Sequence, residues 1–159
     1  MKRVFGLILA VCMTSAFALP ALGAAQPLQE VKTAAKHAQI ATGMDTADKV
    51  HLHLHHVINC LVGPNGDGFD AKAGNPCEKM GAGAMQDVDL SDPLHAQLAE
   101  ALGAAQQGLK EDDAPKAALL AGEAHSLLQS ASDKLQQRQK NRQQRQSQNS
   151  QSMTKPAGG

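Results

Sequence analysis

Apolar residues recur every three or four positions in four segments of the chain, which is the spacing that places them on one face of an α-helix. Each of the last two segments starts with an acidic or hydroxyl residue followed closely by a proline, a combination typical of helix starts. The pattern predicts four amphipathic helices and an all-α fold. The four helices are expected to begin at Leu28, at Asp45 or Thr46, at Ser91 or Asp92, and at Asp112 or Asp113.

Short turns join the predicted helices in pairs. The first helix stops at Gly43, and only two or three residues separate it from the second helix, which runs to about Val62. A turn this short makes the two helices an antiparallel hairpin. The third and fourth helices form the other hairpin. We therefore expect an antiparallel four-helix bundle over residues 26–136.

A long loop joins the two hairpins. Residues 63–90 contain six glycines and two prolines, which favour turns and loops. A loop of this length inside a compact domain usually has a function or is held in place by a cross-link. Cys60 and Cys77 are placed to pin its first half to the end of the second helix. A disulfide is the first interpretation of this pair, and two thiolate metal ligands are the alternative.

The amino-terminal residues have the three-part pattern of a secretory signal peptide. Lys2 and Arg3 precede an almost wholly apolar run from Val4 to Leu19, and the small residues ALGAA follow Pro20. We predict a signal peptide over residues 1–25 and a mature protein that is periplasmic or secreted, with no stable membrane anchor. The alternative is an uncleaved anchor, since the apolar run approaches the length of a membrane span.

Charge and aromatic content narrow the range of partners. Residues 26–133 hold seven lysines and all fifteen acidic residues, a net charge of −8, whereas residues 134–159 hold six basic residues and no acidic one. Residues 137–159 are rich in Gln and Arg without an apolar stripe, which predicts a low-complexity tail that frays and becomes disordered. Phe69 is the only aromatic residue after the predicted signal peptide. Single-stranded nucleic acid is bound by stacking on aromatic rings, so we expect no nucleic-acid partner.

Metal-ligating side chains are concentrated in the second helix. At about 100° per residue, His51 and His55 lie together at one edge of its apolar face, His53 lies at the opposite edge, and His56 points further out. Neither a buried face nor an exposed face of a helix requires four histidines within six residues. The remaining histidines are distributed over the other three helices: His37 in the first, His95 in the third and His125 in the fourth.

The helical hairpin relates these histidines in space. His37 lies about seven residues before the first turn and His51 about seven after it, so the two should be level. Imidazoles at positions i and i+4, completed by a residue of a facing helix, can hold zinc, copper or nickel. The alternative is neutral imidazoles on a surface, which tune stability below about pH 6.5. The predicted metal sites are His51, His55 and His37 for the first and His56, His95 and His125 for the second, with His53 assigned to neither.

The segments KHAQIA, VHLHLHHVINCLVGPNGDGFDAKAGNPC and GAGAMQD resemble a family of small exported bacterial proteins of largely uncharacterised function. The resemblance covers residues 37–87, and HxHLHHxxNCLxGP and NPC are its most specific parts. More loosely, AAKHAQIA and LLAGEAHSLL are similar to the periplasmic small metal-binding proteins, helical bundles that take up copper and other divalent ions. This chain departs from them in its cysteine loop and in its few histidines outside the second helix. The resemblance therefore implies one or two metal sites rather than a high-capacity buffer.

Sequence motifs of common enzymes are missing from the chain. It has no C-x-x-C-H, G-x-S-x-G or H-E-x-x-H motif and no glycine-rich phosphate loop beside a strand, so we expect no enzyme. The predicted function is an exported protein that binds or buffers a divalent transition metal (copper, zinc or nickel) through the histidines of the second helix. One alternative is a structural or partner-binding bundle, which another periplasmic protein contacts at the loop between Cys60 and Cys77. A second alternative is a bundle that holds haem non-covalently between two histidines.

Overall fold

The computed structural model describes residues 25–154, which form five α-helices and no strand. The all-α prediction is confirmed. The predicted signal peptide lies outside the described residues apart from Ala25. None of the described helices combines the length and the apolar character needed to cross a membrane. The helices are α1 (Pro27–Thr42), α2 (Ala47–Val62), α3 (Ala84–Asp87), α4 (Pro93–Gly108) and α5 (Ala114–Thr154).

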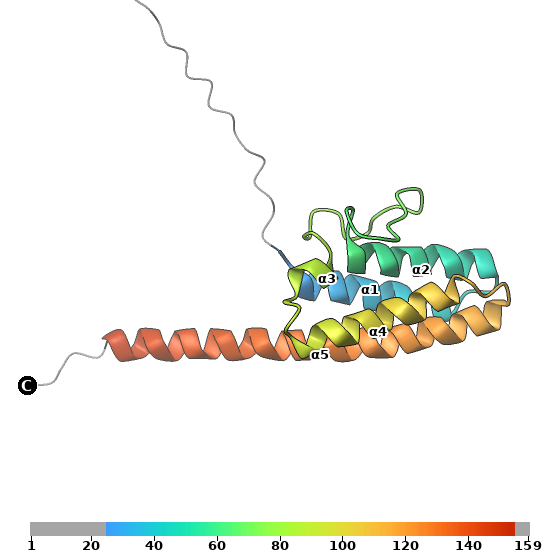
Figure 1. The fold of residues 1–159 in the computed structure, drawn as a ribbon. Coiled ribbons are helices and arrows are strands. Elements are labelled where there is room, and N and C mark those ends of the chain that lie inside the picture. Colours follow the sequence, from blue (N-terminus) through green and yellow to red (C-terminus); the bar gives the residue numbers. More distant parts are fainter. Residues whose placement is uncertain (1–24, 155–159) are drawn as a thin grey trace, which may run out of the picture.

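Four of these helices share one core. In Figure 1, α1, α2, α4 and the first part of α5 lie side by side, and the α1–α2 and α4–α5 turns are at the same end. Helix α1 contacts α2 and α5, and α4 contacts α5 and α2. Alanines fill much of the space between them, which lets the helix axes approach closely. Fully buried core residues include Ala34, Ala38, Leu54, Leu98, Ala121 and Leu128.

The start of α4 is defined by its capping residue. The Asp92 carboxylate accepts a hydrogen bond from the Leu94 backbone N–H at 2.9 Å, and Pro93 fills the first helical position, where no N–H is needed. Arg138 of α5 donates to both oxygens of the same carboxylate. Asp92 therefore caps α4 and ties its start to α5.

Helix α5 continues through the Gln- and Arg-rich segment as far as Thr154. The composition of this segment predicts fraying and disorder instead. In Figure 1 this part of α5 projects beyond the other helices, and all side chains of residues 136–151 are exposed. Gln, Arg and Lys have high helix propensity, and neither glycine nor proline interrupts the segment before Pro156. Local propensity therefore accounts for a helix that has no apolar face to bury.

The long loop is attached to the helices at two points. A disulfide joins Cys60, at the end of α2, to Cys77, with the two Cα atoms 5.2 Å apart and both residues buried. Further along, the backbone of Gly83 crosses that of Gly63, and both glycines have positive φ, 114° and 66°. A Cβ atom on Gly63 would collide with the Ala82 carbonyl. Glycine is therefore required where the loop returns to the end of α2.

A buried carboxyl group fixes the returning loop to α1. Glu30 is 1% exposed, and its Oε1 accepts a hydrogen bond from the Gly83 backbone N–H at 3.1 Å. Burial, reinforced by the neighbouring Asp87, raises the pKa of Glu30 from 4.5 to about 7. A second bond, from the Gln26 N–H to the Met80 carbonyl at 2.8 Å, holds the same region. The start of α1 therefore serves as the platform for residues 80–83.

Replacing both Cys60 and Cys77 by Ala should lower the free energy of unfolding by about 3 kcal/mol, because the bridge no longer restricts the unfolded chain. Urea denaturation of the variant and of the oxidised protein measures the difference. Chemical reduction of the unaltered protein should reproduce most of it. Equal midpoints for the oxidised and reduced forms would contradict the prediction.

Replacing Glu30 by Gln should stabilise the protein increasingly as pH rises from about 4.5 to 7. Over this range the unfolded carboxyl ionises while the folded one keeps its proton, so the unaltered protein loses stability with rising pH. Gln retains an oxygen for the Gly83 N–H and has no proton to lose. Denaturation at several pH values tests this, with the exposed Glu100→Gln as control. A stability difference independent of pH would contradict it.

Candidate metal site

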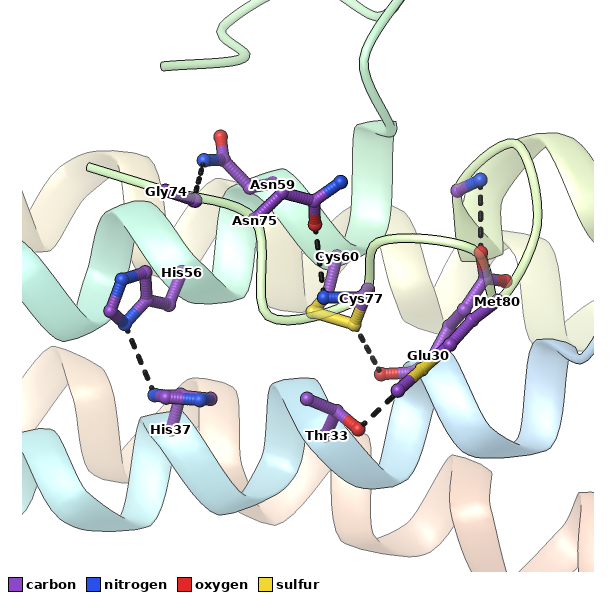
Figure 2. Close-up of a disulfide and its surroundings, with 11 residues drawn as sticks. Glu30, Thr33, His37, His56, Asn59, Cys60, Gly74, Asn75, Cys77 and Met80 are labelled. Atoms are coloured by element: carbon purple, nitrogen blue, oxygen red, sulfur yellow. Dashed lines mark hydrogen bonds between the residues drawn. A yellow bond between two sulfur atoms is a disulfide. The ribbon is translucent and has the colours of Figure 1, made fainter. Parts of the chain in front are cut away.

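Three imidazoles from α1 and α2 converge in the space between the two helices. The Nδ1 atom of His37 lies 3.1 Å from Nδ1 of His53 and 3.2 Å from Nδ1 of His56. One ligand nitrogen from each ring lies within 4.8 Å of the other two. Figure 2 shows the rings of His37 and His56 pointing toward each other from the two helices. Among the described residues, no other group of three or more His, Cys, Asp or Glu side chains comes this close together.

The spacing of the two histidines on α2 explains this arrangement. His53 and His56 are three residues apart, which places them on the same side of the helix, and that side faces α1. The helices α1 and α2 pack directly against each other. The ring centroids of His37 and His56, one from each helix, are only 4.6 Å apart.

A backbone carbonyl determines which nitrogen of His56 faces the cluster. The Nε2 atom of His56 lies 2.7 Å from the carbonyl oxygen of Ala73. A carbonyl oxygen only accepts, so Nε2 must carry the proton, and in the neutral ring Nδ1 is left with its lone pair directed at His37. Metal-binding histidines are commonly oriented in this way, by donating their other N–H to a carbonyl. His56 is therefore prepared to act as a ligand through Nδ1.

Two of the three distances between the nitrogens suit a tetrahedral ion. Zinc–nitrogen bonds of about 2.0–2.1 Å at tetrahedral angles place two ligand nitrogens about 3.4 Å apart. The observed separations of 3.1 and 3.2 Å need to widen by only a few tenths of an ångström. Imidazole is a good ligand for zinc, copper and nickel. Three ligands from the protein leave a fourth coordination position for water or another small ligand.

The imidazoles of His37 and His53 are held in their neutral forms near neutral pH. Burial, together with charge repulsion from the nearby His56, His53 and Lys36, lowers the pKa of His37 from 6.5 to about 4. Burial and then His56 also lower the pKa of His53. Because a metal ion binds only the unprotonated nitrogen, neither residue has to release a proton when the ion binds near neutral pH.

The remaining histidines lie outside the cluster. The Nε2 atom of His51 lies 3.0 Å from the carbonyl oxygen of Glu111, in the turn between α4 and α5. The Nδ1 atom of His125 lies 3.0 Å from the carbonyl of Ala35. His55 lies near Asp70, with Nδ1 3.6 Å from Oδ2. His95 borders a shallow surface cavity beside α3.

The structure thus groups the histidines differently from both predicted sets. His37 belongs to the cluster as expected, but its partners are His53 and His56 rather than His51 and His55. The edge of α2 that carries His51 faces the α4–α5 turn, and the opposite edge faces α1. The predicted grouping of His56 with His95 and His125 is also not formed. His53, which the helical wheel assigned to neither site, completes the cluster.

No protein-family model, curated protein or solved structure matches this chain. Both resemblances noted in the sequence therefore stay predictions. A function for the protein has to be argued from the geometry of the histidine cluster, His37, His53 and His56.

In the metal-free protein, the imidazole of His37 should titrate near pH 4, and that of His53 below 6.5. Because the unfolded chain binds these protons at higher pH than the folded chain does, the two residues should reduce stability as pH falls from about 6.5 toward 4. Imidazole resonances followed by NMR through a pH titration, with a chelator present, give the midpoints directly. A His37 midpoint at or above 6.5 would refute the described burial of the cluster.

Proposed function

We propose that this protein is an exported four-helix bundle that reversibly binds one divalent transition-metal ion, copper, zinc or nickel, through His37, His53 and His56. The observation that carries the proposal is the convergence of three imidazole nitrogens within 4.8 Å of one another on two packed helices. Two of the three separations, 3.1 and 3.2 Å, are close to those of a tetrahedral ion.

The surroundings of the cluster support a binding role over a purely structural one. The core is built mainly from apolar residues of α1, α2, α4 and α5 and does not include the cluster, so the fold does not need the ion to assemble. All three histidines are half-buried rather than enclosed, which leaves a path for an ion to enter and leave. An ion with an open fourth position at a half-buried site can exchange, as binding, buffering or delivery requires.

The alternative of non-covalent haem is less well supported. A haem held by two histidines occupies the space between their rings. Here the rings of His37 and His56 already meet edge to face, with their centroids 4.6 Å apart. This contact favours a single ion, which fits between the nitrogens without separating the helices.

Export is part of the proposal. Lys2, Arg3 and the apolar run that follows them have the pattern of a signal peptide. A disulfide between Cys60 and Cys77 would persist in an oxidising compartment. Export would also explain why the pair is used as a bridge rather than as thiolate ligands.

Measuring the metal content of variants shows whether the ion is bound by the cluster or by the histidines at the other edge of α2. The protein, exported to a bacterial periplasm, purified and stripped of metal, is dialysed against copper, zinc or nickel and analysed by plasma mass spectrometry. We expect one ion per chain. Replacing both His53 and His56 by Ala should weaken binding by more than about 100-fold, because two of three ligands are lost.

The matched control replaces His51 and His55 by Ala, which removes two histidines from the same helix but from outside the cluster. This variant should bind like the unaltered protein. If it loses the metal while the His53→Ala/His56→Ala variant keeps it, the ion is bound at the other edge of α2. A folded protein that takes up none of the three metals would refute the proposed function.

A further inference from the structure

One buried side chain holds the part of the loop that covers α2 next to the histidine cluster. Asn59 is fully buried, and its Nδ2 donates hydrogen bonds to the carbonyls of Asp70 and Gly74, at 2.7 and 2.6 Å. Its Oδ1 accepts from the Asp70 backbone N–H at 2.8 Å. Figure 2 shows Asn59 reaching from α2 to Gly74. A single amide group thus fixes both ends of the five-residue segment 70–74.

The same segment carries the hydrogen-bond acceptor of His56. Ala73 lies between the two anchored residues, and its carbonyl oxygen is 2.7 Å from His56 Nε2. Asn59 follows His56 by three residues, so both side chains leave α2 on the same side and reach the same stretch of loop. The position of the Ala73 carbonyl therefore depends on Asn59.

The disulfide and Asn59 hold the loop at separate points. Cys77 lies three residues beyond Gly74, and Asn75 Oδ1 accepts a hydrogen bond from the Cys77 N–H at 3.0 Å. The bridge limits how far the loop can move from α2. It makes no contact that selects the orientation of the Ala73 carbonyl, whereas the three hydrogen bonds of Asn59 do.

We propose that Asn59 is a positioning residue for the metal site: by anchoring residues 70–74 it presents the Ala73 carbonyl to His56 Nε2, and so makes Nδ1 the ligand atom of His56. The proposal rests on the proposed function for its metal-bound part. Without Asn59 the carbonyl moves, the proton of His56 distributes between the two ring nitrogens, and the ring has to be reoriented when the ion binds.

The test compares the unaltered protein with Asn59→Leu, which keeps the branched shape and the number of heavy atoms of the side chain and removes all three hydrogen bonds. Long-range ¹⁵N–¹H NMR spectra report which nitrogen of His56 carries the proton in the metal-free protein. We expect Nε2–H in the unaltered protein, a mixture of tautomers in Asn59→Leu, and a zinc affinity about 10- to 100-fold lower in the variant.

Asn75→Ala is the matched control, because it removes an asparagine hydrogen bond from the same loop without touching residues 70–74. It should leave the tautomer and the zinc affinity unchanged. A general loosening of the loop would instead make the two variants behave alike, which overturns the specific role of Asn59.

The tautomer of His56 in the unaltered protein tests the proposal even if Asn59→Leu does not fold. A proton on Nδ1 of His56 in the metal-free protein overturns the proposal directly. If Asn59→Leu folds and His56 remains entirely in the Nε2–H form, the positioning role is likewise overturned. A folded protein that binds no zinc, copper or nickel refutes the proposed function separately, because the tautomer is measured without metal.

Discussion

The disulfide between Cys60 and Cys77 holds the long loop against the helices, and the organisation of this side of the molecule depends on it. The 21 residues between α2 and α3 lose much conformational entropy when they are confined to one path. The bridge reduces that loss by restricting the unfolded chain as well. Weaker contacts can then act on a segment that is already nearby: Asn59 aligns residues 70–74, and Glu30 captures the backbone of Gly83. The hydrogen bond from His56 to Ala73 is the last of these contacts and the one that reaches the cluster.

Burial has opposite consequences for two residues of α1, Glu30 and His37. At Glu30 it disfavours the carboxylate, so the group keeps its proton to about pH 7. At His37 it disfavours the imidazolium, so the ring stays neutral to about pH 4. Between these values both groups are uncharged, and neither end of the α1 surface carries an unpaired buried charge. The neutral form of Glu30 stabilises the loop, whereas the neutral form of His37 leaves a nitrogen lone pair available to a cation.

Much of the helical architecture follows from local sequence. Asp92 with Pro93 starts α4, and Gly43 follows the end of α1, as the pattern of apolar and capping residues predicts. The projecting end of α5 shows the opposite case, since a low-complexity composition predicted disorder there. The composition shows that this segment has no apolar face to bury. Gln and Arg nevertheless favour the helical backbone at each position, and this preference does not need an apolar face. The short helix α3 lies in a glycine-rich segment and depends on the crossing of Gly63 and Gly83, which only the folded loop creates.

The histidine cluster shows where sequence reasoning stops. Counting residues from the first turn places His37 level with His51, and the observed partner His53 is only two residues further along α2. Two residues along a helix, however, rotate the side chain by about 200°, to the opposite edge. A helical wheel identifies both edges of α2 but not which of them faces α1, because that depends on how the second hairpin packs against the first. Once α4 and α5 contact the edge that carries His51, the edge with His53 and His56 remains for α1, and the three nitrogens that meet there are the ones best placed to hold an ion.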